Sequence, residues 1–189
     1  MNTPSTEQIA KFIGESILKY RNVKFEFHPT PKLKIGGIEC TGEAVKDRLS
    51  IATGGPLDNW LEVFIHETSH LDQQAERPKW FEECDMKVEL LTKWLDDPSI
   101  QFNTSDLFKI IELEHDCESR TISKINKYGL PIDTKLYSKK ANAYILSYGN
   151  TYKNKKWDVT PYQDTKRLEI MPDELISLSR AIGLIEELI

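Results

Sequence analysis

The sequence predicts an α+β fold that is mainly α-helical and contains a small antiparallel sheet before its most informative helix. Three short runs rich in β-branched and aromatic residues lie at 23–27, 33–41 and 48–53, separated by prolines and a polar stretch. Apolar residues recur at helical spacing in the segments near 9–20, 60–71, 80–95, 104–128, 134–148 and 172–185. A chain of 189 residues without an internal repeat is expected to form a single domain, residues 1–189.

Composition argues against several classes of protein. The chain is 39% hydrophobic and 29% charged, with a net charge of −5, and this mild acidity makes a nucleic-acid partner an unfavoured expectation. No apolar run approaches the length of a membrane span, and residues 1–10 lack the layout of a signal peptide. The three cysteines are odd in number and show no CxxC spacing, so we expect a reduced, cytoplasmic chain.

The most informative stretch is residues 63–73, VFIHETSHLDQ, which contains the pattern H-E-x-x-H. On a helix, residues four apart lie one above the other, so His66 and His70 can bind one Zn²⁺ through imidazole nitrogens. Glu67 follows about 100° around the axis, where it can reach a metal-bound water without being a ligand. The cation would acidify the water and the carboxylate would take its proton, which is the arrangement that hydrolysis requires.

The alternative is that both histidines are core residues hydrogen-bonded to carbonyl groups, with Glu67 at a solvent-exposed edge. The surrounding segment is apolar nearly all round. Imidazoles in such surroundings need partners, and a metal ion would supply them. We therefore interpret the motif as a zinc site.

A second candidate is the helix expected at residues 104–128, which ends before Gly129. Glu114 and Glu118 fall in the centre of its apolar face. Two carboxylates there would be destabilising unless something cationic neutralised them. A zinc ion would do so, with one glutamate as the third ligand and the other accepting a hydrogen bond from a histidine. Lys or Arg partners, or a slightly rotated helix, are the alternative.

These two motifs together resemble the glutamate zincins, a group of zinc metallopeptidases in which a later helix supplies the third ligand from an E-x-x-x-E pattern. The separation of the motifs is similar to that in lethal-factor-like toxin peptidases. The resemblance implies a zincin-like fold, with Glu114 as ligand and Glu118 as the supporting carboxylate. The metzincin continuation is absent, because Gln73 and Glu76 stand where a glycine and a third histidine would be. His115 as third ligand ranks below the two glutamates.

Zincins commonly require a His, Tyr or Arg to stabilise the oxyanion, and Tyr144, Tyr148 and His115 are the candidates here. Core packing is the competing interpretation for both tyrosines. The strand expected at 48–53 runs into the H-E-x-x-H helix. If that strand is an exposed edge, an extended peptide could pair with it beside the metal; an ordinary edge without a substrate role is the alternative.

The function expected from the sequence is zinc-dependent hydrolysis of a peptide or amide bond in a peptide or protein substrate, with Glu67 as general base. Two alternatives remain: a non-catalytic zinc-binding or protein-interaction module that keeps the H-E-x-x-H helix, and a structural protein with a fortuitous motif.

Overall fold

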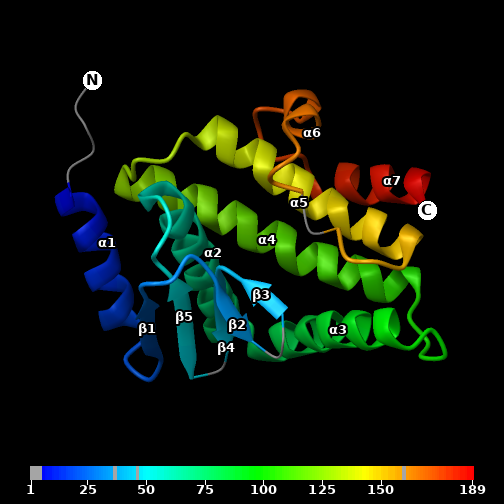
Figure 1. Cartoon of the computed structure of the whole chain (residues 1–189), viewed down its shortest axis with the longest axis horizontal. Coiled ribbons are helices and arrows are strands. Elements are labelled where there is room, and N and C mark those ends of the chain that lie inside the picture. Colours follow the sequence, from blue (N-terminus) through cyan, green and yellow to red (C-terminus); the bar gives the residue numbers. More distant parts are fainter. Residues whose placement is uncertain (1–5, 36–37, 46, 159–160) are drawn as a thin grey trace. The chain divides into compact units, whose positions relative to one another are not determined.

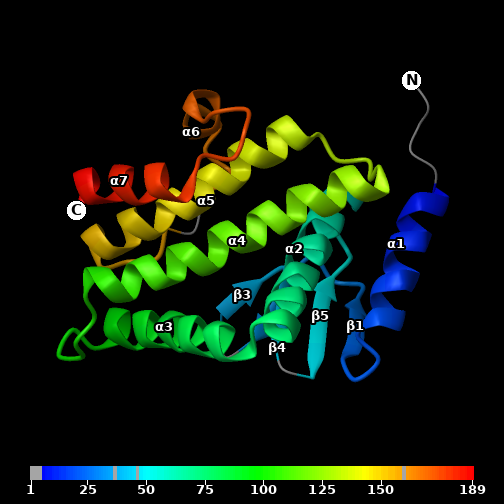
Figure 2. The ribbon, with the colours of Figure 1, turned by 180° about the vertical axis from the view of Figure 1, so that it is seen from behind.

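The computed structural model describes residues 6–35, 38–45, 47–158 and 161–189, and Figures 1 and 2 show its ribbon from opposite sides. The described part is mostly helical with a small mixed sheet, which confirms the α+β class. The chain divides into two compact units, Met1–Glu76 with Arg120–Ile132 and Arg77–Ser119 with Asp133–Ile189. The single domain expected from chain length stays a prediction.

The first unit contains the strands and two complete helices. Its elements are α1 (Thr6–Lys19), β1 (Lys24–His28), β2 (Leu33–Ile35), β3 (Ile38–Cys40), β4 (Gly42–Val45), β5 (Arg48–Ala52) and α2 (Leu57–Glu76). The sheet has the order β1-β5-β4, in which β1 is parallel and β4 antiparallel to β5; β2 and β3 pair separately. The expectation of an antiparallel sheet is therefore wrong. Within the stretch at 33–41, β2 and β3 pair in antiparallel orientation, and the polar stretch that follows forms β4. β5 is antiparallel to β4 and therefore runs beside β1 in the same direction as β1.

The strand β5 is the centre of the sheet, with β1 on one side and β4 on the other. Leu49 and Ile51 on β5 are fully buried. The hypothesis that this segment is an exposed edge, with or without a peptide partner, is therefore wrong. Within the part of the chain that the structure describes, β4 is an outer strand of this sheet.

The helix α2 contacts both β4 and β5, and its apolar face fixes its position. Phe64 is fully buried and meets three aromatic rings at centroid distances of 5.7 Å for Phe12, 6.1 Å for Phe25 and 5.8 Å for Phe27. Burying one phenylalanine side chain contributes about 1.5–3 kcal/mol of stability. The motif thus lies on a helix held by α1 and the sheet.

The last two turns of α4 (Thr104–Tyr128) belong to the first unit and pair with α2 through polar side chains. The Thr121 hydroxyl donates to Ser69 Oγ at 3.1 Å, and Lys124 Nζ lies 2.7 Å from Asp72 Oδ2. Asp72 is nearly buried and also pairs with Lys19. These contacts fix the last turns of α4 against the C-terminal half of α2, which carries the motif.

The second unit is helical. It comprises α3 (Pro78–Asp96), the first four turns of α4, α5 (Thr134–Asn154), α6 (Thr165–Ile170) and α7 (Leu178–Leu188). Its core includes Leu91, Leu107, Ile110, Ile145 and Ile185, all fully buried. The observed bounds of α4 agree with the segment expected from the sequence. Gly129 follows α4 with a φ of +59°, a left-handed conformation that glycine adopts without strain.

Two expected helix bounds in this unit are wrong. The helix expected at 134–148 continues through Gly149 to Asn154, because this glycine serves packing instead of ending the helix. A Cβ added at Gly149 would lie 3.1 Å from Ile185 Cγ1, so α5 and α7 approach closely there. The final helix begins at Leu178, where the Ser177 side chain accepts from the Arg180 N–H, and not at Pro172.

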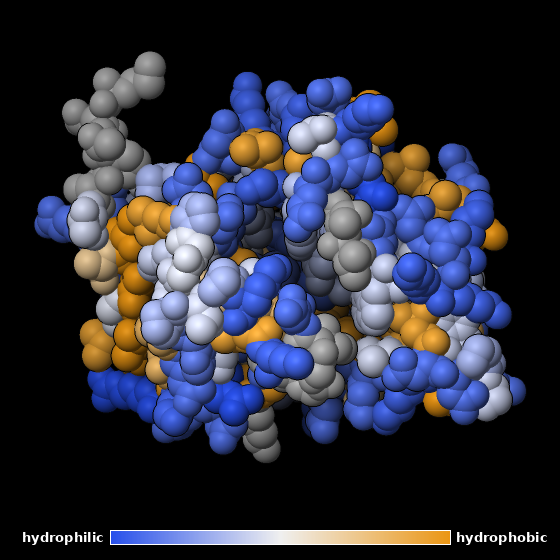
Figure 3. Space-filling model, in the orientation of Figure 1, coloured by the Kyte–Doolittle hydropathy of each residue, from blue (hydrophilic) through white to orange (hydrophobic). Residues whose placement is uncertain are grey.

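The surface drawn in Figure 3 is mainly hydrophilic, with hydrophobic atoms gathered over α1. Ile17 and Leu18 on this helix are exposed. Among the helices that the structure describes, none combines the length and apolar character needed to cross a bilayer.

Candidate metal centre

The helix α2 brings His66 and His70 together, as the four-residue spacing predicts. Their Nε2 atoms lie 3.2 Å apart, and their rings are nearly perpendicular with centroids 4.8 Å apart. Two nitrogens bound tetrahedrally to zinc at about 2.05 Å would lie about 3.3 Å from each other. Both side chains are half-buried. The contact is a hydrogen bond between the two rings, and its length is also close to the separation that a shared zinc ion requires.

Gln73 holds the imidazole of His70 in a definite orientation. Its Oε1 lies 2.8 Å from His70 Nδ1, and the Gln73 side chain is fully buried. A carbonyl oxygen only accepts hydrogen bonds, so Nδ1 carries the proton. The unprotonated Nε2 then accepts from His66 Nε2, and it is the nitrogen that would bind a cation. Sequence reasoning used Gln73 only to exclude a metzincin. Its spacing of three residues from His70, one helical turn, was the signal for this contact.

Glu67 is half-buried on α2 beside the start of β4. A Cβ built on Gly42 would lie 3.2 Å from Glu67 Cγ and 2.4 Å from Val63 Cγ1, so strand and helix approach closely. Burial, followed by the charges of Glu43 and Glu67, raises the pKa of the Cys40 thiol on β3. The predicted general base thus lies next to an outer strand of the sheet. Its catalytic role stays a prediction.

Glu114 and Glu118 lie on the buried face of α4, as predicted, with 5% and 2% of their surface exposed. Each accepts a hydrogen bond from a tyrosine of α5: Tyr148 donates to Glu114 Oε1 at 3.2 Å and Tyr137 to Glu118 Oε2 at 2.6 Å. A hydroxyl supplies a hydrogen bond but no charge, so these contacts do not neutralise two carboxylates one turn apart. Their role as zinc ligands stays a prediction.

The candidate oxyanion stabilisers all have defined partners. The hydroxyls of Tyr144 and Tyr148 lie 2.8 Å apart. Because Tyr148 gives its one proton to Glu114, Tyr144 must donate to Tyr148. Burial, followed by the charge of Glu114, raises the pKa of both tyrosines well above the ordinary value. His115 Nε2 lies 2.8 Å from the carbonyl oxygen of Ile176. These residues would have to leave these partners to stabilise an oxyanion, and that role stays a prediction.

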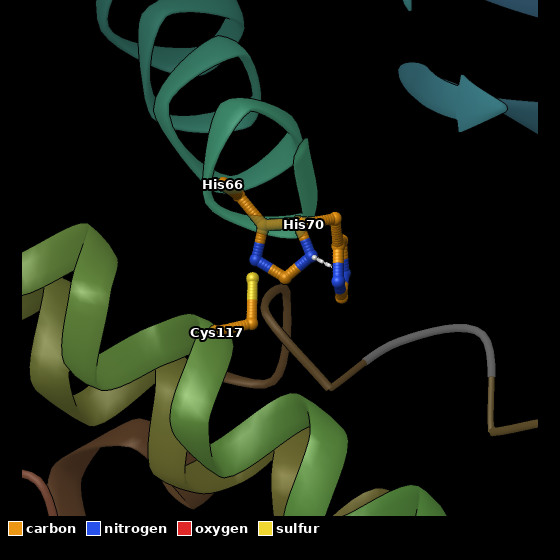
Figure 4. A group of neighbouring side chains, drawn as sticks. All are labelled: His66, His70 and Cys117. Atoms are coloured by element: carbon orange, nitrogen blue, oxygen red, sulfur yellow. Dashed lines mark hydrogen bonds between the residues drawn. The ribbon is translucent and has the colours of Figure 1, made fainter. Parts of the chain in front are cut away.

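Cys117 is the residue that sequence reasoning missed. His66, His70 and Cys117 form a group whose ligand atoms all lie within 4.8 Å of one another, and which could hold a metal ion (Figure 4). Cys117 is buried, three residues after Glu114 and one turn before Thr121, which bonds to α2. The sequence could have indicated Cys117 only through its place on the buried face of the helix α4.

The donors gathered here are those that zinc prefers, because imidazole nitrogen, carboxylate oxygen and thiolate sulfur are its usual protein ligands. The three cysteines carry no disulfide. No family model matches the chain, and neither a curated protein nor a solved structure matches it.

Proposed function

We propose that the protein is a zinc metallopeptidase of the glutamate-zincin type. The observation that carries the proposal is the convergence of His66 Nε2 and His70 Nε2 to 3.2 Å on a helix that also bears Glu67. The motif alone can occur by chance, and the paired nitrogens and the Gln73 contact support its interpretation as a cation site.

Zinc would supply Lewis acidity, which lowers the pKa of a coordinated water and polarises the carbonyl of the scissile bond. His66 and His70 would hold the ion as neutral imidazoles. Glu67 would take a proton from the attacking water at its carboxylate and return it to the nitrogen of the leaving amine. Because an amine leaves poorly without a proton, this transfer is the step that makes Glu67 indispensable.

The third protein ligand would come from α4. We propose that it is a carboxylate, from Glu114 or Glu118, because carboxylate oxygen is a usual zinc ligand and both side chains lie on the buried face of α4.

An extended peptide is the substrate class that the sheet favours. The outer strand β4 begins at Gly42, in close contact with the α2 turn that carries Glu67. An outer strand offers backbone N–H and C=O groups to a partner in extended conformation. A peptide paired with β4 would lie near Glu67. The sequence suggested β5 as the strand that pairs with a peptide, but β5 is the central strand, so we propose β4 instead.

A structural zinc site is the second candidate, and the position of Cys117 favours it. If its sulfur joined two imidazoles and a carboxylate, four protein donors would fill the tetrahedral shell and leave no position for water. Such a protein would hold zinc and cleave nothing.

The experiment that separates these functions combines metal analysis with cleavage of a broad peptide library. We expect wild-type protein to contain zinc and cut peptides, Glu67→Gln to contain zinc without cutting, and His70→Ala to lose both. Glu82→Gln is the matched control, because it makes the same change at an exposed residue of α3. Zinc without cleavage in the wild type would indicate the structural site, and no zinc would contradict both candidates.

A further inference from the structure

The helix α1 has two apolar faces, and one of them is open to solvent. Its buried residues are Ile9, Phe12 and Ser16. The other face, which we call the outer stripe, repeats at the spacing of one side of a helix and consists of Ala10, Ile13, Gly14, Ile17 and Leu18. Leu18 is 64% exposed and Ile17 is 41% exposed.

The outer stripe accounts for hydrophobic atoms that gather over α1 at the surface (Figure 3). Single exposed apolar residues are common in proteins and need no explanation. A run of such residues at regular helical spacing is different, because one flat partner surface can cover all of them together. The outer stripe therefore has the pattern of a helix face that packs against another helix.

Gly14 lies in the middle of the outer stripe, inside α1. Glycine within a helix is destabilising relative to alanine. A Cβ added at Gly14 would meet no atom within 4 Å, so no packing contact within the described part of the chain accounts for this glycine. A second helix that crossed α1 at Gly14 would meet only backbone there and could approach closely.

The two ends of the outer stripe carry opposite charges. Glu7 lies in the first turn of α1. Arg21 follows the helix, and its Nε donates to the carbonyl oxygen of Leu18 at 3.3 Å, which holds the guanidinium group beside the last turn. Glu7 and Arg21 lie seven residues before and seven residues after Gly14. The charge pattern is therefore complementary to itself when the helix is reversed about Gly14.

We propose that the outer stripe is the interface of a symmetric homodimer, in which two copies of α1 pack antiparallel and cross at Gly14. A two-fold axis at this point brings Glu7 of each copy opposite Arg21 of the other and Ala10 opposite Leu18. Each acid then meets a base and each small residue a large one. The antiparallel helix dipoles also attract each other. This interface does not involve the candidate metal centre.

The length of α1 limits the strength of this dimer. Its 14 residues span about 21 Å at about 1.5 Å per residue. One pair of such helices gives an interface at the small end of the specific range, below about 1,200 Å². We therefore expect a weak dimer that dissociates on dilution, and not a permanent one.

Sedimentation velocity of the full chain between about 1 μM and about 1 mM, the range of weak complexes, tests the proposal. The wild-type sedimentation coefficient should rise with concentration. Leu18→Glu should weaken self-association by more than about tenfold, because it removes two leucines from each dimer. Leu136→Glu is the matched control, since it makes the same change at an exposed leucine of α5 and should leave self-association unchanged. Circular dichroism of both variants checks that they fold.

A charge exchange tests the antiparallel arrangement. Glu7→Arg alone and Arg21→Glu alone should each weaken self-association several-fold, because each places like charges opposite one another twice in the dimer. An equimolar mixture of the two variants should associate again, since both contacts of the mixed dimer join opposite charges. The recovery should be larger at low ionic strength, where exposed charges are less screened.

The proposal predicts a definite result in each experiment. A wild-type chain that stays monomeric up to about 1 mM, a dimer that Leu18→Glu leaves intact, or a mixture that associates no better than its separate variants would each overturn it. None of these results bears on the proposed function, which metal analysis and peptide cleavage test separately.

Discussion

The close approach of β4 to α2 gives a prediction that can be worked from distances. In Gly42→Ala, the new Cβ would lie 2.4 Å from Val63 Cγ1 and 3.2 Å from Glu67 Cγ. Carbon atoms pack at about 3.5–4.0 Å, so strand and helix must separate by about 1 Å near Val63. Rotation of Val63 offers little relief, because a β-branched residue in a helix strongly prefers one rotamer.

Overpacking of this kind costs about 1–3 kcal/mol of unfolding free energy. For a chain of this size, that loss corresponds to a melting temperature lower by about 2–12 °C. A shift of about 1 Å at Glu67 would also reduce peptide cleavage by about 10²-fold, because proton transfer depends on position.

The assay is thermal unfolding by circular dichroism, with zinc content and cleavage measured on the same preparations. Gly55→Ala is the matched control, since a Cβ there meets no atom within 4 Å, and its stability should change by less than about 0.5 kcal/mol. If Gly42→Ala melted at the wild-type temperature and kept full activity, the described packing of β4 against the Glu67 turn would be refuted.

Three further predictions concern the site and its supporting helix. Gln73→Leu should weaken zinc binding by about 10–100-fold and Gln73→Glu should not, because only leucine removes the acceptor for His70 Nδ1; equal affinities in a chelator competition would contradict this. Co²⁺-substituted protein should lack an intense near-ultraviolet thiolate band, and a band that disappears in Cys117→Ser would show a sulfur ligand instead. Burial would raise the pKa of Asp106, but Lys87 and a backbone N–H outweigh it and lower the pKa from the ordinary 3.8. The contribution of Asp106 to stability is therefore present above pH 3.8 and lost as the pH falls through the folded-state pKa. In urea unfolding, Asp106→Asn should be less stable than wild type at neutral pH. The stabilities of the two proteins should become similar in acid.

Patterns that repeat along a single helix were predicted well from the sequence. The bounds of α4 (Thr104–Tyr128), the shared direction of His66 and His70, and the burial of Glu114 and Glu118 all follow from helical geometry. Each depends on residues one or two turns apart, so local spacing is enough to determine them.

Features that depend on which distant segments pair were not predictable in the same way. The polar stretch became β4 because its backbone pairs with β5, and hydropathy does not report backbone pairing. Gly149 was expected to end a helix but lies inside one, since its lack of a Cβ admits Ile185 of another helix. Cys117 belongs to the candidate site through its neighbours in space, which its residue type does not reveal. The contact of Gln73 with His70, in contrast, is local to one helical turn and could have been predicted from spacing.

Elemental analysis of protein purified without chelators tests the central claim most directly. We expect about one zinc per chain, as in a mononuclear site, and almost none in a His66→Ala/His70→Ala double variant that still folds. Wild-type protein without stoichiometric metal, or a double variant that keeps its zinc, would contradict the claim that the two imidazoles of α2 bind a shared cation.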